Sequence, residues 1–290
     1  MAEPVTIDDL AGGVRLITLN RPEKKNALTG AMYDAMRAGL AEADASDAVG
    51  AVVFAGQPGM FSAGNDLADF MGGAAGGFSA SPALAFIRQL ARTRTPMVAA
   101  IDGIAVGIGA TLSLHCDLVY ASPAARLRMP FVELGLVPEA ASSYLLPLRV
   151  GRLKATELLL LSRPLDADEA LALGLVNAVL PADMLLDQAI AQAAKLAALP
   201  RGALAASRAL IRGDQAQVEA ALEAEARAFD AQLRSPESQE RLAAFLARSK
   251  PASSARAAPP ICPKKSAGWP APPGGSGGAW PGRSARPGRP

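Results

Sequence analysis

The chain has 290 residues, a formal net charge of +2, one histidine and two cysteines. This length suffices for one large domain or two small ones, and the histidine and cysteine counts favour neither a zinc site nor a disulfide framework. The apolar runs are shorter than the roughly 20 residues that span a bilayer, and the first residues lack the pattern of a signal peptide. We therefore expect a cytoplasmic protein that spans no membrane and needs no metal.

The net charge is unevenly distributed along the chain. Residues 250–290 contain seven Lys and Arg and no Asp or Glu, so residues 1–249 carry a charge of about −5. The body therefore gives no sign of a nucleic-acid surface. Residues 250–290 are rich in Pro, Gly, Ser and Ala, which predicts a disordered tail. This tail either contacts an anionic polymer or is an accidental extension past the natural end of the domain.

The front half of the chain alternates predicted strands and helices. Runs rich in β-branched residues predict strands at 5–8, 14–19, 50–55, 96–101 and 118–121. Thr29 resembles the N-cap of a helix that runs to about Ala45, and a second helix is predicted at 81–92. Between them, the glycine-rich segment 72–77 is either a mobile lid or a plain linker.

The back half of the chain reads as helical. Apolar periodicity predicts helices at 141–149, 154–161, 167–173, 183–198, 203–212, 215–233 and 237–248. An α/β front half followed by helices favours one continuous α/β architecture over two separate domains.

Two junctions built from small residues stand between predicted strands and helices. The first spans 61–67 and contains Gly64, and the second spans 103–112 and leads into a helix expected at about 110–115. Two such junctions are able to direct two backbone N–H groups at one ligand oxygen, which is an oxyanion hole. The alternative is close packing of helix on sheet through glycine.

These segments resemble the crotonase (enoyl-CoA hydratase/isomerase) superfamily, in the right order over about residues 5–245. The matching motifs are Asn20-Arg21-Pro22, Asn26-Ala27-Leu28, Phe61-Ser62-Ala63-Gly64-Asn65-Asp66-Leu67 and the run from Gly103 to Asp117. The resemblance implies a spiral of ββα units, an acyl-CoA thioester substrate, and a homotrimer or hexamer. It further implies a core over 1–200, a C-terminal helical trimerisation region over 201–249 and the tail over 250–290.

The resemblance also implies roles for individual residues. The N–H groups of Asn65 and Ile108 would bind the thioester oxygen. Hydratases of the superfamily use two glutamates, but this chain has Thr111 and Phe131 at those positions. Both acids are missing, which argues against efficient hydration.

A different acid is available at Glu139. The run 130–144 resembles the peroxisomal-type Δ3,Δ2-enoyl-CoA isomerases, in which the glutamate at this position is the single catalytic base. Such a base takes a proton from C2 of a 3-enoyl thioester and returns it at C4, and the apolar Phe131, Leu136 and Val137 are expected to raise the pKa of Glu139 by desolvation. From position alone, Glu139 also fits an acid that favours a helix N-terminus.

We therefore expect an isomerase of fatty-acid oxidation that needs no cofactor, since CoA is part of the substrate. The alternatives are a hydratase or another crotonase-type lyase, and a non-catalytic acyl-CoA-binding subunit. By the resemblance, the residues expected to contact substrate or CoA are Lys24, Ala27, Leu28, Ser62, Ala63, Gly64, Asn65, Asp66 and Phe131.

Several of these polar residues also have a structural interpretation. Asp66 is expected to orient its loop by accepting backbone N–H bonds, and Lys24 is either a CoA-phosphate ligand or a solvated charge. Glu133 is the rival acid, interpreted as solvated or ion-paired. The remaining polar residues are expected in the core or at helix ends: His115, Cys116 and Asp117.

Overall fold

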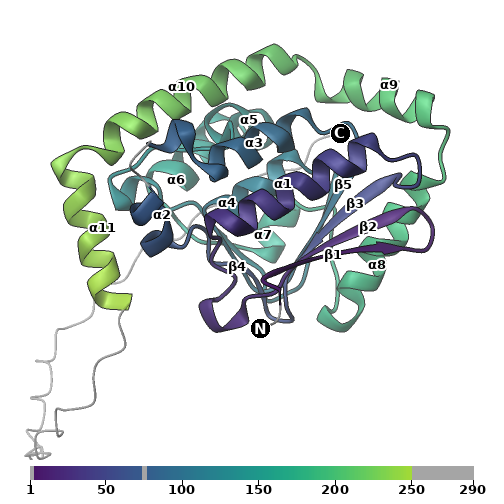
Figure 1. The fold of residues 1–290 in the computed structure, drawn as a ribbon, viewed down its shortest axis with the longest axis horizontal. Helices are drawn as coiled ribbons and strands as arrows, with labels where there is room; N and C mark the ends of the chain where they lie inside the picture. The colour runs from purple at the N-terminus through teal and green to yellow at the C-terminus, as the bar shows by residue number, and fades with distance from the viewer. Residues whose placement is uncertain (1–2, 74–76, 250–290) are drawn as a thin grey trace, which may run out of the picture. The chain divides into compact units, whose positions relative to one another are not determined.

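In the computed structural model, which describes residues 3–73 and 77–249, the strands form a six-stranded and a four-stranded sheet (Figure 1). The larger sheet has the order β1-β2-β3-β5-β7-β10, with β1 antiparallel to β2 and the others parallel. The smaller sheet has the order β4-β6-β8-β9, with β9 antiparallel. The strands are β1 (Val5–Leu10), β2 (Val14–Leu19), β3 (Ala51–Ala55), β4 (Met60–Ser62), β5 (Met97–Ile101), β6 (Ile104–Val106), β7 (Leu118–Ala121), β8 (Arg126–Arg128), β9 (Leu165–Asp166) and β10 (Ala178–Val179).

Three consecutive units of the chain follow the same path. Each unit places one strand in the larger sheet and the next strand in the smaller sheet, and then forms helix. These units are β3-β4 with α2 (Leu67–Gly73) and α3 (Pro82–Arg92), β5-β6 with α4 (Ile108–Thr111), and β7-β8 with α5 (Ser142–Val150). The spiral of ββα units that the resemblance implies is confirmed, and it places the ends of β4, β6 and β8 next to one another.

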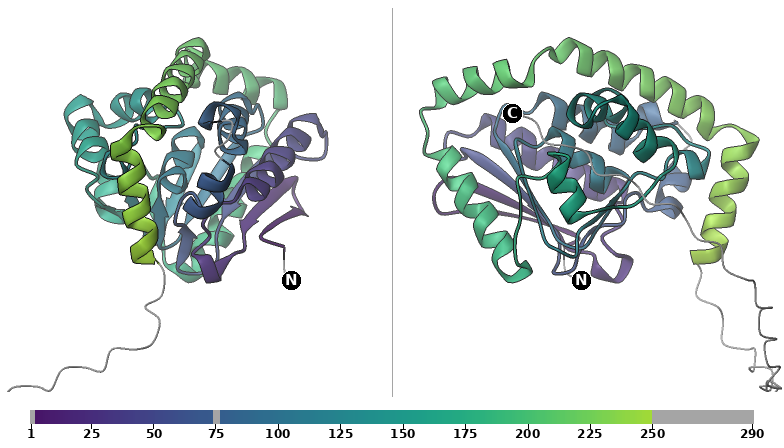
Figure 2. Two further views of the ribbon diagram at one scale, coloured as in Figure 1. Left: turned by 60° about the vertical axis from the view of Figure 1, so that its left-hand side comes forward. Right: turned by 180° about the vertical axis from the view of Figure 1, so that it is seen from behind.

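Helices cover both faces of the larger sheet (Figure 2). On one face, α8 (Ala182–Ala197) packs Leu185, Ala189 and Ala193 against small and β-branched strand residues. On the other face lie α3 and α1 (Gly30–Ala45). The predicted cap of α1 is present, since Thr29 Oγ1 accepts a hydrogen bond from the Met32 N–H at 3.4 Å.

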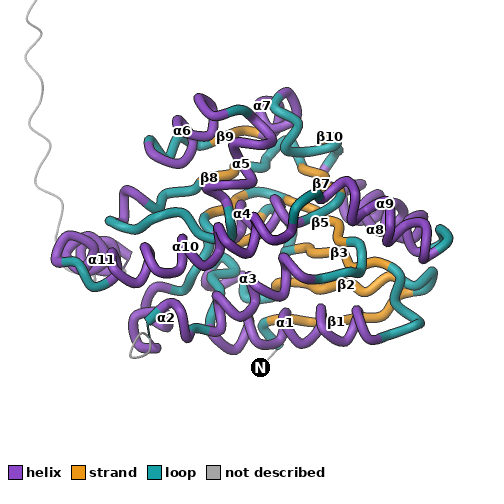
Figure 3. The backbone as a smooth tube through the Cα atoms, turned by 90° about the horizontal axis from the view of Figure 1, so that it is seen from above, coloured by secondary structure: helices purple, strands orange, loops and turns teal. Residues whose placement is uncertain are grey.

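The back half of the described chain is mostly helical, as predicted, but it also contains the short strands β9 and β10, which the sequence did not predict (Figure 3). The long helix α10 (Gln215–Leu233) packs on α3 and α5. No helix within residues 3–73 and 77–249 has the length and apolar character needed to cross a membrane. The other helices of this half are α6 (Arg152–Leu160), α7 (Ala167–Ala172), α9 (Arg201–Arg212), α10 (Gln215–Leu233) and α11 (Pro236–Ser249).

Some details differ from the sequence predictions. The helix expected at about 110–115 begins at Ile108 as one α-helical turn and continues as a 3₁₀ helix over Leu112–His115. Asp117 does not end this helix, because its carboxylate accepts bonds from the Met97 N–H and from Arg208 Nε. Gly72 and Gly73 end α2, whereas residues 74–76 of the expected lid or linker and the predicted tail 250–290 lie outside the described residues.

Candidate active site

The two small-residue loops contact each other through their backbones. A Cβ on Gly64 would lie 2.7 Å from the carbonyl oxygen of Val106, and one on Gly109 would lie 2.9 Å from that of Ser62. Gly64 also has φ +88°, which a side chain would strain. The glycines therefore allow the end of β4 and the end of β6 to meet. Asn65 follows this contact directly.

Backbone hydrogen bonds pass on either side of Asn65 and leave its N–H unused. The Leu28 N–H donates to Gly64 O at 2.8 Å, and the Asp66 N–H donates to Leu28 O at 2.9 Å. In the same way, Ile108 opens α4, so its N–H belongs to the first helical turn, which has no intrahelical acceptor. Neither the Asn65 nor the Ile108 N–H has an acceptor in the described part of the chain.

A buried asparagine fixes the loop that precedes α1. Asn26 has φ +50° and is fully buried. Its Oδ1 accepts the Arg21 N–H at 2.7 Å, and its Nδ2 donates to the carbonyl oxygens of Met60 and Phe61 at 3.1 Å. Ser62 Oγ in turn donates to Asn26 O at 2.8 Å. These bonds join the loop at Asn26 to β4, the strand that leads to Gly64.

Asp66 has the structural role expected from the sequence. Its Oδ1 accepts the N–H groups of Ala68 and Asp69 at 3.1 and 3.2 Å, which caps the start of α2. Its Oδ2 accepts a hydrogen bond from Arg21 Nη1 at 2.7 Å. Asp66 therefore ties the loop after Asn65 to the loop before α1.

Glu139 lies in a buried polar contact with α4. Glu139 is 3% exposed, and Thr111 Oγ1 donates a hydrogen bond of 2.6 Å to Glu139 Oε1. Burial raises the pKa of Glu139 to about 8, the Thr111 hydrogen bond opposes this rise, and the charge of Glu225 adds to it. Oε2 accepts no hydrogen bond from the described residues, so it is available to a substrate proton.

A buried tyrosine links the Asn65 loop to α1. Tyr33 Oη donates a 2.5 Å hydrogen bond to Asn65 Oδ1. Burial raises the pKa of Tyr33 well above its ordinary value, and the charge of Glu139 adds to this rise. The hydroxyl therefore remains protonated and holds the side chain of Asn65. Tyr33 was not predicted as a site residue, although it is a polar-tipped residue beside the apolar stripe of α1.

Glu225 of α10 is a second residue near Glu139 that was not predicted from the sequence. The residue is 6% exposed, and its carboxylate accepts the N–H groups of Ala141 and Ser143, two and four residues after Glu139. The signal for it was an acid on the apolar face of a predicted helix, three residues after Leu222.

The remaining predicted residues are placed as follows. Phe131 is buried, and Lys24 and Lys25 are exposed in the loop before α1. Both carboxylate oxygens of Glu133 accept bonds of 2.7 Å from Arg128 Nη2, which makes it the ion-paired acid expected. Among the residues described, no three His, Cys, Asp or Glu side chains gather as metal ligands.

His115 and Cys116 are buried, as expected for core residues. Burial lowers the pKa of His115 to about 4, so its ring is neutral, and its Nε2 lies 2.8 Å from the carbonyl oxygen of Ala140. Burial raises the pKa of the Cys116 thiol to about 12. Neither group is therefore charged at neutral pH.

Comparison with known proteins supplies the family. A family model described as enoyl-CoA hydratase/isomerase matches residues 9–255. The chain belongs to this family. The enoyl-CoA hydratase/isomerase family assignment confirms the resemblance drawn from the motifs at 20–28, 61–67 and 103–117.

Individual relatives carry both names of the family. The chain is 36% identical over 265 residues to a probable enoyl-CoA hydratase of Rhizobium meliloti (strain 1021), covering 86% of this chain and 98% of that protein. It is 40% identical over 210 residues to enoyl-CoA delta isomerase 2 of Rattus norvegicus, covering 70% of this chain but 53% of that protein. The chain thus spans about half the length of the rat relative.

Solved structures of similar proteins share the fold. The enoyl-CoA hydratase/isomerase of Pseudoalteromonas atlantica T6c superposes with a TM-score of 0.80 at 40% identity, covering 87% of this chain and 100% of that chain. OdaA of Pseudomonas aeruginosa gives a TM-score of 0.81 at 39% identity, covering 84% and 99%. The chain therefore has the crotonase fold and is an enzyme of the hydratase/isomerase family.

Proposed function

We propose that this family member is a Δ3,Δ2-enoyl-CoA isomerase that moves the double bond of 3-enoyl-CoA to the 2-position in fatty-acid oxidation. One observation carries the proposal: Glu139 is buried beside a threonine, Thr111, where the resemblance places a hydratase glutamate. The other buried carboxylate among the described residues is Glu225, and both of its oxygens accept bonds from the backbone of the turn after Glu139. Glu139 is thus left as the acid for the reaction.

The proposed reaction needs one base and a site for negative charge. Glu139 Oε2 takes a proton from C2, and the electron pair of the C–H bond moves toward the thioester carbonyl to give a dienolate. The N–H groups of Asn65 and Ile108 stabilise the resulting oxyanion, and losing one such donor costs about 3–4 kcal/mol of barrier. The protonated Glu139 then gives its proton to C4, which leaves the double bond between C2 and C3.

The raised pKa of Glu139 suits this task. A carboxylate with a pKa of about 8 is a stronger proton acceptor than an ordinary glutamate, and it is still ionised in an appreciable fraction of molecules near neutral pH. Hydration needs a second acid or base to activate water at C3. The position that the resemblance assigns to that second glutamate holds the buried Phe131, which has no proton to exchange.

The proposal is tested by offering 3-enoyl-CoA and 2-enoyl-CoA separately and identifying the products by mass and ultraviolet absorbance. We expect 3-enoyl-CoA to gain the absorbance of a conjugated thioester without a change of mass, and 2-enoyl-CoA to gain no water. Glu133→Gln is the matched control for the Glu139→Gln variant, because Glu133 is an exposed, ion-paired acid six residues before Glu139. A mass gain of one water would support the hydratase alternative instead. Binding without release of the C2 proton into deuterium oxide would support a non-catalytic acyl-CoA-binding subunit.

We further propose that the enzyme acts as a homotrimer or hexamer in the cytoplasm, with no organic cofactor or metal and with residues 201–249 in the trimer contacts. An apolar surface on α5 and α6 supports association: Leu148 is 67%, Leu153 88% and Leu160 54% exposed. Light scattering of the purified chain tests this, and a monomer at micromolar concentration would contradict it.

A further inference from the structure

The turn that follows Glu139 has an unfavourable backbone conformation. Ala140 and Ala141 have φ +58° and +54°, in the left-handed region that is unfavourable for a non-glycine residue. Helix α5 begins directly afterwards at Ser142, and Ala141 at its N-cap has no side chain that accepts a hydrogen bond. Contacts from elsewhere in the chain must therefore hold this turn.

Glu225 of α10 supplies those contacts from more than 80 residues away. Its Oε2 accepts the Ala141 N–H at 2.7 Å. Its Oε1 accepts the Ser143 N–H at 2.9 Å and the Ser143 hydroxyl at 2.5 Å. Burial raises the pKa of Glu225 above its ordinary value, and these hydrogen bonds oppose that rise because they stabilise the ionised carboxylate.

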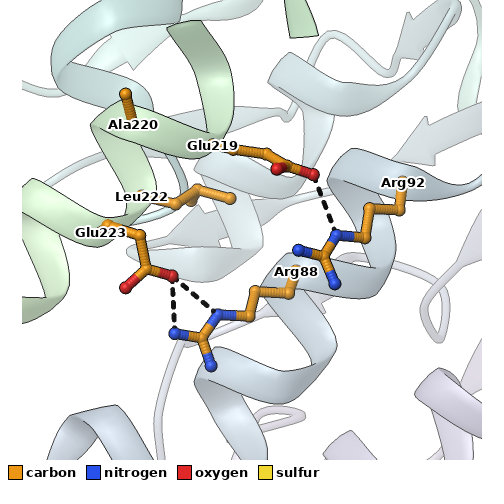
Figure 4. Close-up of a pocket in the computed structure, with 6 residues that line it drawn as sticks. All are labelled: Arg88, Arg92, Glu219, Ala220, Leu222 and Glu223. Atoms are coloured by element: carbon orange, nitrogen blue, oxygen red, sulfur yellow. Dashed lines mark hydrogen bonds and ion pairs between the residues drawn. The ribbon is translucent and has the colours of Figure 1, made fainter. Parts of the chain in front are cut away.

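The helix that carries Glu225 has a fixed place on α3 (Figure 4). The buried face of α10 includes Leu222, whereas its outer side forms two exposed ion pairs with α3. Arg88 Nη2 lies 2.7 Å from Glu223 Oε1, and Arg92 Nε lies 3.0 Å from Glu219 Oε1. The apolar packing of its buried face orients α10, so Glu225 faces the turn after Glu139 and not solvent, while the exposed ion pairs add little.

We propose that Glu225 is a positioning residue for Glu139: by binding Ala141 and Ser143 it holds the turn that directs the Glu139 carboxylate into the site. This inference rests on the proposed function only in that Glu139 is taken as the base. Glu225 does not touch the substrate in this account, and it acts through the backbone of the turn and through its charge.

The charge of Glu225 has a separate effect. Burial is the main cause of the raised pKa of Glu139, and the negative charge of Glu225 adds to it. The other groups of the described chain that face Glu139 or its turn are uncharged at neutral pH: Thr111 of α4, Tyr33 of α1 and His115 of the 3₁₀ helix. Removing the charge of Glu225 should therefore lower the pKa of Glu139.

The variant Glu225→Gln distinguishes a positioning role of Glu225 from a purely structural role. The amide keeps one acceptor but places N–H groups opposite a backbone donor, so the turn loses part of its support. We expect kcat for 3-enoyl-CoA to fall about 10-fold or more with KM within about twofold, and the acidic limb of the pH profile to move down by about half a unit. Ser143→Ala keeps the charge of Glu225 and removes the hydrogen bond from the Ser143 hydroxyl. We therefore expect kcat to fall while the acidic limb of the pH profile stays in place.

Glu223→Gln is the matched control on the same helix. It removes an exposed charge whose ion pair contributes little to stability, and we expect wild-type kcat and pH profile. If Glu225→Gln does not fold, Glu225→Asp keeps the charge on a shorter side chain and is expected to lower kcat without moving the limb. Wild-type kcat and an unmoved limb in folded Glu225→Gln, or wild-type kcat in Glu225→Asp, overturn the inference.

A second readout does not depend on turnover. The infrared carbonyl band of protonated Glu139, identified by its loss in Glu139→Gln, titrates with pH, and we expect its midpoint to be lower in Glu225→Gln than in the wild type. An unchanged midpoint overturns the inference even if the enzyme isomerises. Conversely, absence of Glu139-dependent isomerisation in the wild type overturns the proposed function and leaves this titration to decide the role of Glu225.

Discussion

Thr111 donates a 2.6 Å hydrogen bond from α4 to the carboxylate of Glu139, which lies just before α5. The two residues come from successive ββα units, and the contact of β6 with β8 brings them together. The hydroxyl stabilises the charged form of Glu139, whereas burial destabilises it. The balance of these two effects sets how much of the base is ready to react at neutral pH.

Thr111→Val tests this balance, because valine has a similar shape and no hydroxyl. A hydrogen bond to a charged group contributes about 1.5–3 kcal/mol, so its loss should raise the pKa of Glu139 by about one unit. We expect the acidic limb of the kcat profile to move to higher pH and the rate at pH 7 to fall about 10-fold. Thr111→Ser keeps the hydroxyl and should retain the wild-type profile. A profile unchanged in the valine variant would show that this hydroxyl does not tune the base.

Gly64→Ala tests the contact between the two loops. Its Cβ would lie 2.7 Å from Val106 O at a backbone φ of +88°, so the loops must separate. If Asn65 and Ile108 share one oxyanion, kcat should fall about 10²–10³-fold. Gly59→Ala is the control, because Gly59 has φ +75° with no atom within 4 Å of the added Cβ. Equal kcat losses in the two variants would show that backbone strain, and not loop separation, is the cause.

Glu139→Gln should change stability in a way that depends on pH. Because the pKa of Glu139 in the folded chain, about 8, is above its ordinary value of 4.5, its contribution is complete below about pH 4.5 and is lost as the pH rises through about 8. Glutamine does not ionise and keeps the acceptor for Thr111. The variant should therefore match the wild type at pH 4 and be more stable by up to a few kcal/mol at pH 9. Denaturant unfolding at both values measures this, and a constant difference would mean that Glu139 is not buried in its charged form.

The long, strongly patterned elements were predictable from the sequence. In α1, Met32, Met36 and Leu40 recur at helical spacing and are all buried, and α10 lies where its periodicity predicts. Strands such as β9 have two residues, too few to show alternation, and they exist only because a neighbouring strand pairs with them. Such elements depend on tertiary contacts that no local pattern reports.

The same distinction between local sequence pattern and tertiary contact applies to the candidate site. The loop around Gly64 and the run containing Glu139 are contiguous motifs, so the sequence was sufficient to single them out. Glu225 and Tyr33 contact the site only after α10 and α1 have docked, and the partners of Glu225 lie more than 80 residues away. In the sequence, the sign of the Glu225 contact was its charged side chain on the apolar face of a predicted helix.

In the proposed reaction, one buried carboxylate carries a proton between two carbons of the same substrate. The most direct measurement follows 3-enoyl-CoA labelled with deuterium at C2, with the product analysed by NMR at C4. We predict that deuterium reaches C4 in the wild type, because Glu139 is 3% exposed and exchanges slowly with water during the reaction, and that Glu139→Gln slows the reaction about 10²–10⁴-fold. Product without deuterium at C4, formed by Glu139→Gln at the wild-type rate, would contradict the account.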